Sequence, residues 1–200
     1  MVNKTIKTDI CLQLFDIGAV KFGSFKLKDG SMSPIYIDLR MLASYPKLLK
    51  LIAKQLVEIS KDLRYDKIAG IPYAALCIAC AFSLETDKPM IYPRKEVKEY
   101  GTRKQIEGVF NAGDKILVID DLITKGLSKI EAIRPLEEQG LIVKDIVVLL
   151  DREQGGKEAV QAEGYSLHAV LSLSEMLAIL LENKRITKKQ FEELEEYLGK

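Results

Sequence analysis

Apolar positions along the chain follow two spacings, and each spacing predicts a type of element. In residues 4–18 and 45–63 the apolar side chains recur every three or four positions, which is typical of amphipathic helices. The stretches "KIAGI", "PMIYP", "KILVID" and "KDIVVLLD" are short, apolar and rich in Ile and Val. Such runs predict strands that are buried on both faces of a sheet.

Helical segments lie between these strands, and this alternation predicts a parallel sheet. We expect helices over 74–84, 127–139 and 156–163, which right-handed crossovers place on both faces of the sheet. The predicted fold class is therefore α/β, with a central, mostly parallel sheet flanked by helices.

The two ends of the chain predict further elements outside this sheet. "SPIYIDL" (33–39) is expected to form a short strand, and helices are expected after Ser172 and Thr187, which are good N-caps. These terminal pieces can pack together as a smaller cap. A chain of 200 residues, 48% of them hydrophobic, suits a single domain.

Charge and cysteine content narrow the class of protein. The net charge of +1 argues against a general nucleic-acid partner. There is no signal peptide and no apolar run of about 18 residues, so we expect a cytoplasmic protein without a membrane partner. Cys77 and Cys80 lie in an apolar stretch without further ligand residues, and both thiols are expected to be buried.

Two adjacent acids, Asp120 and Asp121, stand at the end of the predicted strand "KILVID", of which Asp120 is the last residue. Ligands of parallel sheets bind beyond the carboxyl ends of strands, so this position favours a binding site. The segment 124–128 predicts a tight turn at a helix start, where amide hydrogens and the helix dipole favour a phosphate. The carboxylates can bind sugar hydroxyls or act through Mg²⁺. Alternatively, the first Asp ends a strand and the second caps the helix.

This stretch, with its apolar run, two acids and Thr-x-Gly-x-Ser loop, resembles the phosphoribosyl pyrophosphate (PRPP) signature of type I phosphoribosyltransferases. Further stretches resemble orotate phosphoribosyltransferase, especially the form found as a domain of the eukaryotic bifunctional UMP synthase. They are "FGSFKLKDGSMSPIYIDLR" (22–40), "GIPYAAL" (70–76), "PRKEVKEYGTRKQIEG" (93–108) and "LLDREQGGKEAVQAEG" (149–164). The resemblance covers residues 15 to 182.

The resemblance implies the type I phosphoribosyltransferase fold, formed by one domain over residues 1–200. Its core is expected at about 45–172. A small hood is expected from about 1–44 and 173–200, together with a flexible catalytic loop.

The resemblance also implies which residues contact the base. The orotate-binding residues are expected to be Lys28, Tyr36, Ile37, Thr124 and Arg152. A flat aromatic carboxylate fits an apolar face and a cation, and a guanidinium matches a carboxylate bidentately. The residues alone leave two alternatives: a plain hairpin with a surface Lys28, and a structural ion pair of Arg152 with a neighbouring acid.

The PRPP-binding residues and the catalytic residues follow from the same resemblance. Arg94, Lys95 and Lys98 are expected to bind the pyrophosphate, and with Asp120 and Asp121 they form the catalytic set. On charge pattern alone, the loop that carries these cations is equally an ordinary solvated loop. The complete PRPP-binding set is expected to be Lys28, Tyr73, Ala74, Arg94, Lys95, Lys98, Tyr100, Asp120, Asp121, Leu122, Ile123, Thr124, Lys125, Gly126, Leu127 and Ser128.

Two positions depart from the family pattern. Ala74 stands where bacterial members often carry Lys, so one cation is missing from the usual set. Leu127 stands where the phosphate loop normally has a hydroxyl or Gly. Both changes bear on the affinity for PRPP.

The implied activity is the Mg²⁺-dependent transfer of ribose 5-phosphate from PRPP to orotate, in pyrimidine biosynthesis. Mg²⁺ is expected to bind mainly through PRPP rather than directly through the protein. The expected partners are the two substrates, a second copy in a homodimer with shared active sites, and, by association or fusion, orotidine 5′-monophosphate decarboxylase. A PRPP-sensing regulator without catalysis and a transferase for another base are the alternatives.

Overall fold

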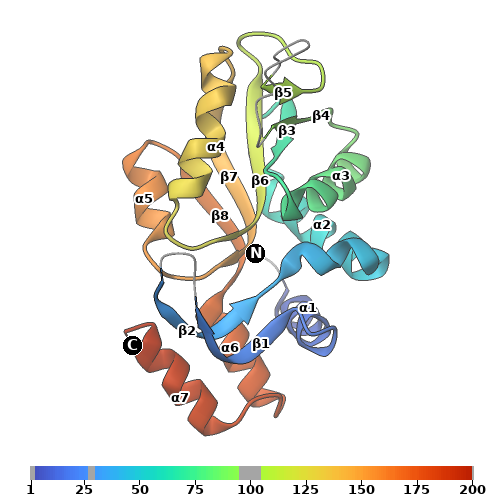
Figure 1. Cartoon of the computed structure of the whole chain (residues 1–200). Coiled ribbons are helices and arrows are strands. Elements are labelled where there is room, and N and C mark those ends of the chain that lie inside the picture. Colours follow the sequence, from blue (N-terminus) through green and yellow to red (C-terminus); the bar gives the residue numbers. More distant parts are fainter. Residues whose placement is uncertain (1–2, 27–29, 95–104, 200) are drawn as a thin grey trace.

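A six-stranded sheet forms the centre of the molecule in the computed structural model, which describes residues 3–26, 30–94 and 105–199 (Figure 1). The strand order is β5-β4-β3-β6-β7-β8, and only β5 is antiparallel to its neighbour. The strands are β3 (Lys67–Gly70), β4 (Met90–Pro93), β5 (Ile106–Glu107), β6 (Lys115–Ile123), β7 (Ile142–Asp151) and β8 (Ser166–Ser172). The expected mostly parallel sheet is confirmed.

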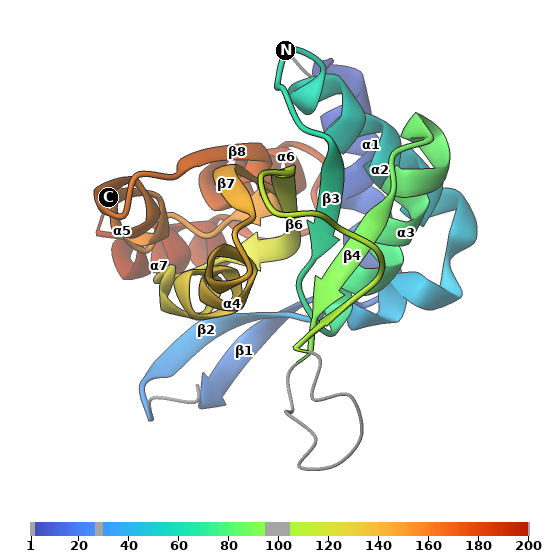
Figure 2. The ribbon, with the colours of Figure 1, turned by 90° about the horizontal axis from the view of Figure 1, so that it is seen from above.

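Helices cover both faces of this sheet, as the view from above shows (Figure 2). On one face lie α2 (Pro46–Ser60) and α3 (Ala74–Thr86), and on the other lie α4 (Leu127–Glu138) and α5 (Gly156–Ala162). Alternate residues of β6 enter the two apolar clusters, because side chains of a strand point to opposite faces. Leu117 packs on the side of α2 and α3, whereas Val118 packs on the side of α4 and α5.

The terminal segments pack beside the sheet, at the bottom of Figure 1. They form α1 (Lys4–Asp16), the antiparallel strands β1 (Val20–Lys26) and β2 (Met32–Ile37), the 3-10 helix η1 (Leu39–Ser44), α6 (Leu173–Glu182) and α7 (Lys188–Tyr197). Helix α1 packs on α6, and α7 packs on both α6 and β2. An ion pair of 2.7 Å between Lys7 and Glu175 also joins the two ends of the chain.

The expected caps of the last two helices are confirmed. The Ser172 hydroxyl accepts a hydrogen bond from the Glu175 amide, and the Thr187 hydroxyl accepts one from the Gln190 amide. In both helices the side chain of this same residue, Glu175 or Gln190, accepts a hydrogen bond from the backbone amide of the cap residue. Each helix start is therefore a complete capping box.

Two sequence-based expectations are wrong. Strand β6 does not end at the acid pair but continues to Ile123, because Asp120 to Ile123 pair with Val148 to Asp151 of β7. Cys80 is exposed and Cys77 is only half-buried. Helix α3 is apolar on nearly all sides, but only one side of it faces the sheet, so Cys80 falls on the uncovered side.

One apolar cluster joins the terminal elements to the sheet. It contains Leu14 of α1, Ile35 of β2, Leu117 of β6 and Leu177 of α6, all fully buried. The boundary between a core and a hood at about residues 44 and 172 remains a prediction, because this cluster extends across it.

Leu177→Ala should therefore destabilise the whole chain, and not only its terminal part. We expect a loss of about 2–5 kcal/mol in the free energy of unfolding, because the substitution leaves a cavity in a fully buried cluster. Chemical denaturation followed by circular dichroism should give one transition at lower denaturant. Val109→Ala, at an 84% exposed position, is the control and should change little. Two separate transitions, only one of them shifted, would contradict this prediction.

Candidate active site

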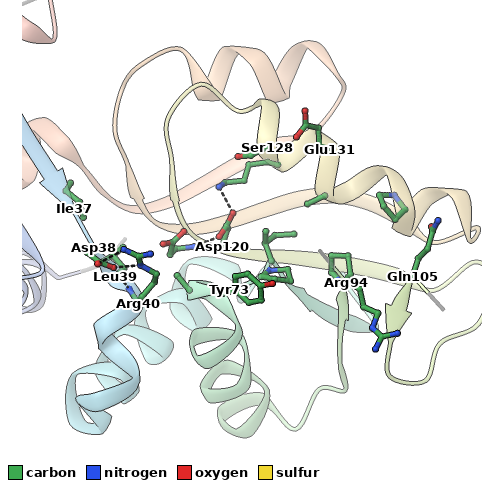
Figure 3. Close-up of a pocket in the computed structure, with 18 of the residues that line it drawn as sticks. Ile37, Asp38, Leu39, Arg40, Tyr73, Arg94, Gln105, Asp120, Ser128 and Glu131 are labelled. Carbon is green, nitrogen blue, oxygen red and sulfur yellow. Dashed lines mark hydrogen bonds and ion pairs between the residues drawn. The ribbon is translucent and has the colours of Figure 1, made fainter. Parts of the chain in front are cut away.

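Two adjoining cavities lie where β3, β4, β6 and β7 end. The first, of about 720 Å³, is lined by the end of β2 and the segment after it, the loop after β3, the end of β4, the acid pair and α4 (Figure 3). The second, of about 700 Å³, is lined by the loop 124–128, the start of β2, the end of β7 and Tyr197 of α7. Ser128 and Lys129 line both cavities, so the two can receive different parts of one ligand.

Asp120 is almost fully buried, with 3% of its surface exposed, and it has a cationic partner. Lys129, in the first turn of α4, places its Nζ 2.5 Å from Asp120 Oδ2. The pKa of the Asp120 carboxyl is raised to about 7, chiefly because the group is buried, although the nearby Lys129 acts in the opposite direction. Two adjacent carboxylates repel each other, and a lysine of the following helix offsets this repulsion here.

Asp121 is the more accessible acid of the pair. Its carboxylate lines the first cavity and is half-buried. The Asp121 amide donates a 2.8 Å hydrogen bond to Asp120 Oδ1, and the Leu122 amide donates an equal one to Asp121 Oδ1. Both carboxylates are thus oriented by the backbone, and Asp121 keeps one oxygen for a ligand.

The loop 124–128, after β6, has a backbone conformation that depends on glycine. Gly126 has φ +82°, in the left-handed region, and a Cβ there would lie 3.0 Å from the carbonyl oxygen of Gly156. Gly156 is just as constrained, because its Cβ would lie 2.5 Å from the Thr124 carbonyl oxygen. The start of α5 therefore packs directly against the loop.

Leu127 occupies the first position of α4, and the helix has no side-chain cap. Leu127 is 65% exposed. A Leu at this position, where the family normally has a hydroxyl residue or Gly, leaves the backbone amides at the helix start in place. The loop can therefore bind an anion through backbone N–H groups even with Leu at this position.

A buried cation, Arg152, lines the second cavity. Arg152 is 6% exposed, and its Nη2 lies 3.4 Å from the Ser33 hydroxyl of β2. Its Nε is buried and, among the described residues, has no hydrogen-bond partner. Burial lowers the pKa of the Arg152 guanidinium, and the nearby Tyr197 opposes this shift. A buried guanidinium with an unused N–H suits an anionic ligand group.

The remaining predicted residues fall into three groups. Tyr36, Ile37, Tyr73, Ala74 and Arg94 line the first cavity, and Arg94 Nε pairs with Glu107 at 3.0 Å. Leu122, Thr124, Lys125, Gly126, Leu127 and Ser128 line the second. The expected base contacts Tyr36 and Ile37 thus line a different cavity from Arg152 and Thr124. Lys28, Lys95, Lys98 and Tyr100 lie outside the described residues.

The side chain of Ile123 is not part of either cavity. It is fully buried in the cluster between the sheet and α4, because β6 continues through this residue. The side chain therefore belongs to the core, and the expected contact of Ile123 with PRPP stays a prediction. The Ile123 carbonyl oxygen accepts a hydrogen bond from the Arg152 amide.

The structure adds cavity residues that sequence reasoning missed. They include Asp38, Arg40, Gln105, Lys129, Gln154 and Tyr197. Lys129 directly follows the Thr-x-Gly-x-Ser loop, and Arg40 closes the stretch "SPIYIDLR", so both stood beside residues already singled out. Nothing in the sequence connects Tyr197, near the end of the chain, with this site.

In residues 3–26, 30–94 and 105–199, no group of three or more His, Cys, Asp or Glu side chains is arranged to hold a metal ion. Among the described helices, none combines the length and the apolar character that a membrane span requires.

Known proteins resemble the chain over nearly its whole length, although no family model matches it. An orotate phosphoribosyltransferase of Pyrococcus abyssi is 43% identical over 173 residues, which are 86% of this chain and 95% of that protein. The chain belongs to the orotate phosphoribosyltransferase family. Bifunctional enzyme PyrF/PyrE of Nostoc sp. is 44% identical over 183 residues, or 92% of this chain and 38% of that protein.

A solved structure gives the same result for the fold. The structure of Leishmania donovani UMP synthase has a TM-score of 0.91 at 41% identity, over 98% of this chain and 43% of that one. The type I phosphoribosyltransferase fold of the orotate phosphoribosyltransferase family is therefore confirmed. The chain spans less than half the length of the bifunctional relatives that it matches.

Lys129→Met should destabilise the protein by about 3–5 kcal/mol, because it leaves the buried Asp120 carboxylate without its cation. The double variant with Asp120→Asn should recover much of this loss, since the unpaired charge is gone. Denaturant titration measures both effects. Lys188→Met, which breaks an exposed pair with Glu192, is the matched control. Equal stability of Lys129→Met and wild type would show that the buried pair is not needed.

Proposed function

We propose that this protein is an orotate phosphoribosyltransferase of pyrimidine biosynthesis. It transfers ribose 5-phosphate from PRPP to orotate, giving orotidine 5′-monophosphate and pyrophosphate. The observation that carries the proposal is the pair of adjoining cavities, which combine an oriented carboxylate, an anion-binding loop and a buried guanidinium. These three features correspond to the ribose hydroxyls, the 5′-phosphate and the orotate carboxylate.

In this proposal the loop 124–128 holds the 5′-phosphate. The backbone amides at the start of α4 supply the hydrogen bonds, and the hydroxyls of Thr124 and Ser128 supply more. Asp121 binds the ribose hydroxyls, while Asp120, held by Lys129, keeps Asp121 in place. Anchoring both the phosphate and the ribose fixes the anomeric carbon relative to the base.

The base binds with its carboxylate on Arg152, in this proposal. The orotate nitrogen loses its proton to solvent water and forms a bond to the anomeric carbon, while the carbon–oxygen bond to pyrophosphate breaks. The electron pair leaves with the pyrophosphate. Arg94 supports the leaving group, and Lys95, Lys98, Tyr100 and Lys28 remain predicted contacts of the same reaction. Cations that face the leaving oxygens stabilise the charge that develops there.

The donor chemistry of the first cavity fits Mg²⁺ that is held mainly by the substrate. Asp121 offers a carboxylate oxygen, which suits a hard cation, but Asp120 is already paired with Lys129. Ribose hydroxyls and pyrophosphate oxygens would complete the ligand set. When bound, Mg²⁺ would neutralise part of the pyrophosphate charge.

The proposal includes a cytoplasmic homodimer with shared active sites. The similarity to the bifunctional enzyme PyrF/PyrE and to UMP synthase supports a fused or associated orotidine 5′-monophosphate decarboxylase as a partner. A PRPP-sensing regulator is the second candidate. The absence of a positive side chain at Ala74 favours it, whereas the buried Arg152 favours an enzyme, because a sensor of PRPP alone needs no carboxylate site.

The proposed reaction is tested by the loss of orotate absorbance with PRPP and Mg²⁺. We expect steady turnover with orotate and none with adenine or hypoxanthine, because only an acidic pyrimidine matches Arg152. Binding of PRPP by well-folded protein without turnover would favour the regulator instead. Turnover with a purine would favour the transferase for another base.

Arg152→Lys should raise the KM for orotate by about tenfold or more, because lysine cannot replace a bidentate guanidinium–carboxylate contact. The KM for PRPP should stay near the wild-type value. Steady-state kinetics with each substrate varied in turn measures this difference. An equal rise in both KM values would mean that Arg152 supports the structure of the whole site and does not specifically recognise the base.

A further inference from the structure

The first cavity is poor in available positive charge, although a pyrophosphate would need it. Three cations among its described residues line the wall, namely Arg40, Arg94 and Lys129. Four acids line it as well, namely Asp38, Asp120, Asp121 and Glu131. The position at the start of α3, which faces the same cavity, is held by the uncharged Ala74.

The three cations differ in how open they are to a ligand. Lys129 is paired with Asp120, and only 10% of its side chain is exposed. Arg94 is paired with Glu107, and 25% of its side chain is exposed. Arg40 is paired with Asp38, but 65% of its side chain is exposed, so its guanidinium is the most accessible of the three.

Hydrogen bonds hold the Arg40 guanidinium in a fixed orientation. Its Nε and Nη2 donate to the two oxygens of Asp38, each at 2.7 Å, and Nη2 also donates to the Tyr36 hydroxyl at 3.1 Å. Asp38 is fixed in turn, because its Oδ1 accepts the Arg40 amide at the start of η1. Nη1 makes no hydrogen bond to any described residue, so it remains available for a ligand oxygen.

Arg40 lies on the same side of the cavity as the start of α3. Helices η1 and α3 pack against each other, and Arg40, Tyr73 and Ala74 line the one cavity. Figure 3 shows Arg40 beside Asp38, in the part of the cavity that also holds Asp120 and Tyr73. A phosphate group placed between the acid pair and the start of α3 would therefore meet Arg40.

We propose that Arg40 binds the pyrophosphate of PRPP and supplies the positive charge that Ala74 does not. The inference rests on the proposed function. Arg40 contacts the leaving group while the bond from the anomeric carbon to the pyrophosphate oxygen breaks, and the electron pair passes to that oxygen. The Asp38 carboxylate and the Tyr36 hydroxyl hold the Arg40 guanidinium in position before the substrate binds.

The test is a rescue experiment with four proteins: wild type, Arg40→Ala, Ala74→Lys and the double variant. Arg40→Ala should weaken PRPP binding by about tenfold, the effect of losing one charged hydrogen bond, with the KM for orotate unchanged. Ala74→Lys should restore most of this binding in the Arg40→Ala background. Calorimetric titration with PRPP and Mg²⁺ measures binding without turnover, and inhibition by pyrophosphate should weaken in parallel.

Controls separate this inference from the proposed function. Arg185→Ala removes an equally charged side chain that pairs with Asp16 at 3.2 Å, away from both cavities, and should bind PRPP like wild type. Arg40→Gln, with the melting temperature measured, serves if the alanine variant folds poorly. Wild-type PRPP affinity in a folded Arg40 variant, or a double variant no better than Arg40→Ala, would overturn the role of Arg40. Absent turnover in the wild type would instead overturn the proposed reaction, and PRPP titration would still test Arg40.

Discussion

The buried ion pair between Asp120 and Lys129 is the constraint on which the site depends. A carboxylate at the end of a central strand is costly to bury unless a cation lies against it. Lys129 meets this need only if α4 begins within a few residues of the strand end, and this requires a short loop with a left-handed glycine. The anion-binding loop is thus fixed by the same interaction that allows the acid pair to be buried.

Much of the fold followed from the sequence, because its elements have clear periods. The alternation of apolar strands and amphipathic helices was enough for the parallel sheet, and Ser172 and Thr187 marked two helix starts correctly. The end of β6 was misplaced, because Asp120 and Asp121 look like a boundary when read alone. Their pairing with β7 depends on a neighbour about thirty residues later, which local pattern does not reveal.

The candidate site was predictable where it is continuous in sequence and unpredictable where the terminal elements enter it. The loop 124–128 and Arg152 were found from short stretches. Arg40 lies at the first cavity because η1 packs against α3, and Tyr197 lies at the second because α7 packs against β2. Both are contacts between distant parts of the chain. Cys80 shows the opposite error, since its apolar neighbours suggested burial on a helix that is covered on one side only.

The close packing of Gly156 against Thr124 has a consequence for binding. The backbone at the start of α5 packs directly against the loop and restricts the conformations that the loop can adopt. A loop that is already ordered loses little conformational entropy when an anion arrives, so more of the interaction energy appears as affinity. A larger side chain at Gly156 would push the loop out of this shape, and we infer that the resulting loss would fall on ligand affinity as well as on folding.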